Sequence, residues 1–148
     1  MKDASVRRLG HALVLGATSA YAVSTVTLDF YGERTAPTEL SLTYLDLLTG
    51  QGTGSGLTVA GGILMTFGAP ILIVILDLML LTGRRPGAAL PGLVAAVATW
   101  ATITIGAALN LLGLDAPFPM GVGFWTQVAC VGIAVAGTLL LLNAPVQD

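Results

Sequence analysis

Four long apolar segments dominate this chain and restrict the folds open to it. They cover residues 9–28, 57–81, 88–112 and 121–142, and together they contain a single charged side chain, Asp77. The hydrocarbon core of a bilayer is about 30 Å thick, so a helix needs about 20 apolar residues to cross it. Each segment reaches that length. The sequence therefore predicts an all-α integral membrane protein, a four-helix transmembrane bundle that forms one domain over residues 1–148.

Composition and connection lengths support this prediction. Only 9% of the residues are charged, whereas soluble domains carry about a quarter. The connections 82–87 and 113–120 are too short to cross a bilayer, so the segments that they join must run antiparallel. We expect an up-and-down topology with one long connection, an external loop of about 28 residues over 29–56.

The basic residues predict the orientation in the membrane, because Lys and Arg accumulate in cytoplasmic connections. Five of the six flank the first segment or fill the 82–87 connection: Lys2, Arg7, Arg8, Arg84 and Arg85. We therefore expect both termini in the cytoplasm. One Lys against five Arg and a richness in Gly, Ala and Leu favour a high-GC prokaryotic genome, and hence the cytoplasmic membrane of a prokaryote.

The external loop leaves one structural question open. Residues 39–48 alternate at Leu40, Leu42 and Tyr44 as a strand would, yet Tyr44, Leu45 and Leu48 also fit one face of a short helix. In either conformation these apolar side chains need cover from the membrane surface, the helices or a partner.

Small residues form stripes along three of the segments. In the first they recur every four residues, and so share one helix face. Such faces let helix backbones approach closely in lipid, so we expect them to pack the helices together or to contact another protein. The predicted packing residues are Ala12, Gly16, Ala20, Ser24, Thr99, Thr102, Gly106, Gly132 and Ala136.

Asp77 is the strongest candidate for a functional or paired polar residue. A charged side chain in a membrane segment is costly and marks a functional site by default. Arg84 shares its predicted helix face, seven residues on, and Arg8 or His11 from the first segment could meet it at a similar depth. Asn110 is the other strongly polar group and lies near the outer end of the third segment. We expect Asp77 to be paired, and its role stays open between structure and function.

The sequence contains no constellation typical of a membrane enzyme. The single cysteine, Cys130, cannot form a dithiol pair, and no cluster of metal ligands falls within a segment. A haem or pigment would have only His11 as an imidazole ligand, so we predict no cofactor or metal. We expect no catalytic residues.

We predict a structural or accessory subunit of a larger membrane protein complex. Its partners would be the lipid bilayer and other membrane subunits or further copies of the chain, with no nucleic acid. One alternative is a small transporter or ion-coupled channel that uses Asp77. Another is a redox subunit that binds a cofactor through His11.

Overall fold

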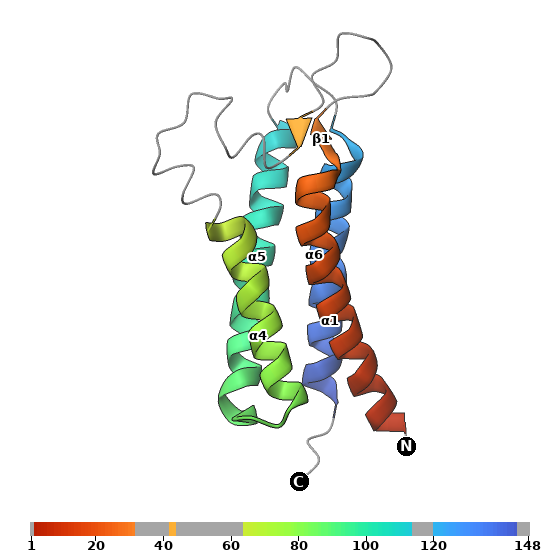
Figure 1. The fold of residues 1–148 in the computed structure, drawn as a ribbon, viewed down its shortest axis with the longest axis vertical. Helices are drawn as coiled ribbons and strands as arrows, with labels where there is room; N and C mark the ends of the chain where they lie inside the picture. Colours follow the sequence, from red (N-terminus) through yellow and green to blue (C-terminus); the bar gives the residue numbers. More distant parts are fainter. Residues whose placement is uncertain (1, 32–41, 44–63, 114–119, 145–148) are drawn as a thin grey trace.

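The computed structural model describes residues 2–31, 42–43, 64–113 and 120–144, and within them four helices lie side by side (Figure 1). Three of these are long and apolar enough to span a membrane. They are α1 (Lys2–Thr27), α5 (Pro86–Gly113) and α6 (Val122–Asn143). The fourth, α4 (Ala69–Leu81), is shorter and follows a π-helical turn, η1 (Leu64–Gly68). A helical, multi-pass membrane protein is thereby confirmed.

The helix boundaries agree with the predicted third and fourth segments to within two residues and differ at the first and second. α1 starts seven residues before the predicted segment 9–28, because its first turns carry the basic residues that reach beyond the apolar part. For the predicted segment 57–81, residues 57–63 lie outside the described part, and the apolar helix found there covers Thr66–Leu81. The described helix is therefore too short to count as a span by itself.

A tight turn joins α4 to α5. The N–H of Gly83 donates to the carbonyl of Leu80 and the N–H of Arg84 to that of Met79, which is the Schellman pattern of a helix C-terminus. Gly83 has a φ of 68°, a conformation that costs other residues strain. Pro86 then occupies the first position of α5, where its missing N–H costs nothing. The turn thus ends α4 sharply at Leu81.

Two short strands lie within the predicted external loop. β1 (Asp29–Tyr31) directly follows α1 and pairs antiparallel with β2 (Leu42–Thr43). The strand alternative therefore holds for residues 42–43. The rest of the segment 39–48, for which helix and strand were both open, lies outside the described residues.

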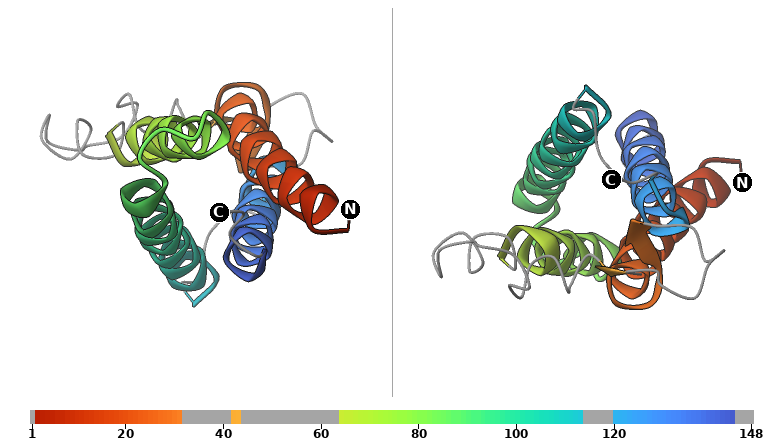
Figure 2. Two further views of the ribbon diagram at one scale, coloured as in Figure 1. Left: turned by 90° about the horizontal axis from the view of Figure 1, so that it is seen from below. Right: turned by 90° about the horizontal axis from the view of Figure 1, so that it is seen from above.

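Seen from either end, the helices stand at four corners, with α1 flanked by α4 and α6 and with α5 diagonally opposite (Figure 2). The start of α1, the α4–α5 turn and the end of α6 lie at the same end of the molecule (Figure 1). This end, which carries Arg7, Arg8, Arg84 and Arg85, is called the basic end below.

The closest approach of two helices is between α1 and α6, and it depends on two glycines. A Cβ atom placed on Gly137 would lie 2.8 Å from the carbonyl oxygen of Gly10 and 2.9 Å from Cβ of Leu13. A Cβ atom on Gly10 would lie 2.9 Å from the side chain of Leu141. The two backbones can therefore meet only because both residues lack a side chain.

Apolar side chains from all four helices fill the space between them. Val14, Ile73, Leu93 and Val131, one from each helix, are fully buried. The rings of Tyr21 on α1 and Trp100 on α5 meet edge to face across the diagonal, with centroids 4.8 Å apart. This edge-to-face geometry is the one that aromatic pairs favour.

Candidate functional site

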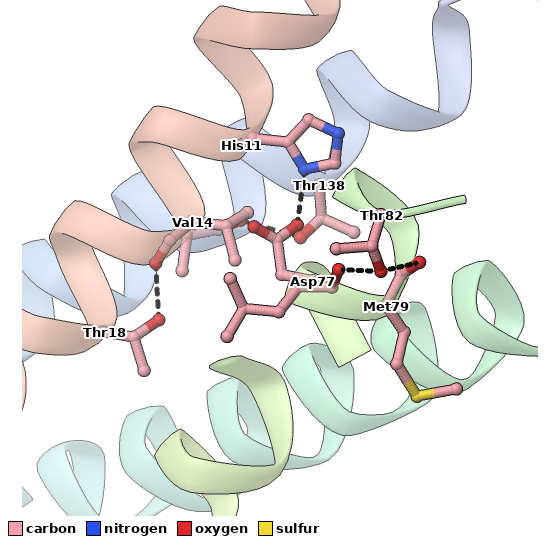
Figure 3. Close-up of polar contacts among 9 residues, drawn as sticks. His11, Val14, Thr18, Asp77, Met79, Thr82 and Thr138 are labelled. Carbon is pink, nitrogen blue, oxygen red and sulfur yellow. Dashed lines mark hydrogen bonds and ion pairs between the residues drawn. The ribbon is translucent and has the colours of Figure 1, made fainter. Parts of the chain in front are cut away.

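One ionisable pair is buried between the helices, and it joins α1 to α4. His11 Nδ1 lies 2.7 Å from Asp77 Oδ1 (Figure 3). Each residue lies on the inward face of its helix, since Val14 and Ile73, about one turn away along α1 and α4, are also buried. The pair lies toward the basic end, because Asp77 comes only four residues before the end of α4.

The two members of the pair differ in their access to the surroundings. The side chain of Asp77 is 0% exposed and that of His11 is 7% exposed. The second carboxyl oxygen, Oδ2 of Asp77, is buried and has no hydrogen-bond partner in the structure as described. The pair therefore satisfies only one of the two oxygens.

Two hydroxyl groups drawn with the pair in Figure 3 do not supply that missing bond. Thr138 on α6 is drawn beside the pair (Figure 3), and its chain neighbour Gly137 packs against Gly10 and Val14 of α1. The hydroxyl of Thr138 donates to the carbonyl of Ala134, at 2.9 Å. Thr18 of α1 likewise donates to the carbonyl of Val14. Both hydroxyl protons are thus used within their own helices.

The structure identifies His11, among the three partners considered for Asp77, as the one in contact. Arg8 and Arg84 are both exposed. The expectation that Arg84 shares a helix face with Asp77 is wrong, because α4 ends at Leu81 and Gly83 turns the chain away. Asn110 falls within α5, but its side chain lies outside the described part.

The predicted packing residues lie mostly on the outer faces of the helices. Ser24 is buried and donates to the carbonyl of Tyr21, and Gly106 is half-buried. The others are exposed: Ala12, Gly16, Ala20, Thr99, Thr102, Gly132 and Ala136. Packing of α1 on α6 uses Gly10 and Gly137 instead. The stripes are real, but most of their members do not face the other helices of this chain.

Several buried polar residues besides His11 were not predicted from the sequence, although some of them show a clear pattern. His11, Thr18 and Thr25 recur every seven residues of α1, and all three are buried. Residues seven apart share a helix face, so this polar line through an apolar segment was open to detection. The buried Trp100 Nε1 and Gln127 Nε2 also lack hydrogen-bond partners in the described part of the chain, and isolated residues such as these leave no pattern.

The chemistry that this arrangement permits is proton transfer. An imidazole and a carboxyl group 2.7 Å apart can share one proton, either as an ion pair or as two neutral groups, and both forms carry no net charge. Among the described residues no group of three His, Cys, Asp or Glu side chains could hold a metal ion. The absence of a cofactor stays a prediction, and a ligand bound through His11 would have only Nε2 available while Nδ1 contacts Asp77.

Comparison with protein families, with curated proteins and with solved structures finds no match to this chain.

Proposed function

We propose that the chain is a single four-helix transmembrane domain, antiparallel and up-and-down, that serves as a structural or accessory subunit of a larger complex. Its place would be the cytoplasmic membrane of a prokaryote, with both termini in the cytoplasm. The gathering of Arg7, Arg8, Arg84 and Arg85 at one end supports this orientation, since basic residues favour the cytoplasmic side.

The observation that carries the proposal is the contrast between the outer faces of the helices. The exposed residues of α4 are all bulky: Ile71, Leu72, Ile75, Leu78 and Leu81. α1 and α6 also expose bulky residues, such as Val23 and Ile133. Unlike α4, they expose small residues among them: Ala12, Gly16 and Ala20 on α1, and Gly132 and Ala136 on α6. A Cβ atom on Gly16 or Gly132 would have no neighbour within 4 Å. Nothing in the described part of the chain therefore requires small residues at those two positions.

Close contact with a helix of a partner would explain those small residues. Lipid tails are as apolar as leucine side chains, so helices associate in membranes through close packing of small residues rather than through apolar burial. The outer faces of α1 and α6 have such residues, whereas that of α4 does not. We propose that α1 and α6 face the partner, which is another membrane subunit or a second copy, and that α4 faces lipid.

The test is the size of the complex in mild detergent, measured by size-exclusion chromatography with light scattering. The unaltered chain should elute in a complex, and Gly16→Leu and Gly132→Leu should each release it as a monomer. Leu78→Phe is the matched control, because Leu78 is 46% exposed on the bulky face of α4, and it should leave the complex intact. A monodisperse unaltered monomer, or leucine variants that keep the complex, would refute the proposal.

The His11–Asp77 pair favours a second candidate, a small ion-coupled transporter or channel that uses Asp77. Buried ionisable residues in membrane helices commonly mark ion pathways, and Asp77 has an unused oxygen turned to the interior. In vesicles loaded with a pH-sensitive dye, Asp77→Asn should then abolish flux while the protein still assembles. Unchanged flux would dismiss this candidate.

A further inference from the structure

The His11–Asp77 pair connects the fully buried interior with the margin of the protein. Asp77 makes no contact with the outside, and the imidazole carries what little exposure the pair has. Nδ1 of His11 is occupied by Asp77, so Nε2 is the ring nitrogen that the pair itself does not use. Nε2 is therefore the atom of the pair through which an outside group can reach the carboxyl.

The ligand that suits this site is a proton. Calcium and magnesium ions require about six or more oxygen ligands, and the described residues form no cluster that could hold a metal. The hydroxyls of Thr18 and Thr138 are already donating within their helices. A proton needs a single acceptor atom, and Asp77 provides one beside an imidazole that can deliver it.

Among the charged and titratable residues of the four helices, His11 is the one in direct contact with Asp77. Apart from the pair, the titratable or charged residues of α1 are Lys2, Asp3, Arg7, Arg8 and Tyr21, and the α4–α5 turn adds Arg84 and Arg85. α4 has none, α5 has none, and α6 has only Cys130. Arg8, Arg84 and Arg85 are exposed. Among the helix residues whose side chains are described, Asp77 is the one with a carboxyl group.

We propose that His11 and Asp77 form a proton-binding site that is loaded from the basic end. A proton from water binds to Nε2 of the neutral imidazole, the Nδ1 proton moves to Oδ1 of Asp77, and a neutral imidazole with a neutral carboxylic acid results. The pair takes up one proton and loses its single negative charge. Loading therefore removes a charge from an apolar interior, where an uncompensated charge is costly.

This inference is independent of the accessory-subunit proposal. It supplies the identity of the ion for the transport candidate but requires no net transport. Proton exchange from one end can take place in a protein that moves nothing across the membrane, so the flux assay and the exchange assay can fail separately.

Infrared difference spectroscopy of the full chain in phosphatidylcholine vesicles tests the site. The carboxylic acid band of Asp77 is identified by its loss in Asp77→Asn, and transfer from H2O to D2O should shift it promptly in the unaltered protein. His11→Asn keeps an amide donor in place of Nδ1 but cannot relay a proton, so exchange should slow by about a hundredfold. Thr138→Val, which removes a neighbouring hydroxyl and no titratable group, should exchange at the unaltered rate.

Two results would overturn the proposal. One is the absence of a protonated Asp77 band over the range in which carboxyl and imidazole groups ordinarily titrate. The other is exchange in His11→Asn as fast as in the unaltered protein, which would show a route to Asp77 that bypasses the imidazole. His11→Gln provides a second relay-deficient variant in case His11→Asn unfolds, and thermal melting of each variant establishes which has folded.

Discussion

Replacing Gly137 with alanine should destabilise the protein by forcing α1 and α6 apart. The added Cβ atom would lie 2.8 Å from the carbonyl oxygen of Gly10, 2.9 Å from Cβ of Leu13 and 3.0 Å from Cγ2 of Val14. Carbon atoms in ordinary contact are about 3.5 to 4.0 Å apart. Two of the three contacts involve backbone or Cβ atoms that no change of rotamer can move, so the helices themselves must shift.

The size of this loss of stability can be estimated by comparison with Gly132, a second glycine on the same helix. Overpacking of this kind costs about 1 to 3 kcal/mol, and alanine also gains up to about 1 kcal/mol of helix propensity over glycine. Gly132→Ala shares the propensity gain without the clash, because Gly132 has nothing within 4 Å of the added atom. Gly137→Ala should therefore be less stable than Gly132→Ala by about 1 to 3 kcal/mol, or about 2 to 12 °C in Tm.

The chain contains a convenient reporter for this measurement. Cys130 is the single cysteine and is only 5% exposed, so a thiol-reactive fluorescent dye will label it on unfolding. Melting curves of the unaltered chain, Gly137→Ala and Gly132→Ala in one detergent give the comparison directly. Equal melting temperatures for the two alanine variants would show that α1 and α6 do not approach closely at Gly10 and Gly137.

Three further predictions use the same melting assay. His11→Leu should destabilise the protein more than Asp77→Leu. The first change leaves the fully buried carboxyl of Asp77 without its imidazole partner, whereas the second leaves an imidazole that is slightly exposed. A larger loss of stability in Asp77→Leu would contradict the difference in burial between the two side chains. Gln127→Met should raise the Tm, since it removes a buried Nε2 donor that lacks a partner among the described residues. The burial of such a donor costs about 1 to 3 kcal/mol, so a lower Tm would indicate a hydrogen bond that the described packing does not provide. Gly83→Ala should cost about 1 to 2 kcal/mol, because Gly83 has a φ of 68° with open space around it, so the strain is conformational alone; an unchanged Tm would argue against this turn.

The sequence alone predicted the class of the protein, because the requirement to satisfy every backbone polar group in lipid leaves helices as the natural solution for long apolar segments. Three membrane-length helices confirm that prediction. Asp77 was also identified from the sequence as a residue that needs a partner, since an isolated charge in that position is unfavourable.

The choice of partner required the tertiary structure. Periodicity places Arg84 on the same helix face as Asp77 only if the helix continues, and the Schellman turn at Gly83 ends it first. His11 is 66 residues away from Asp77 in the chain, and only the packing of α1 beside α4 brings the two together.

The direction of each small-residue stripe was likewise decided by the fold. In a soluble helix the polar face identifies the outside, but lipid is as apolar as a protein core, so this signal is missing in a membrane helix. Spacing shows that Ala12, Gly16 and Ala20 share a face, and it cannot show whether that face points inward. In the structure this face of α1 points outward. The close contact with α6 is made by Gly10 and Gly137 instead, because the packing of the helices determines which small residues meet.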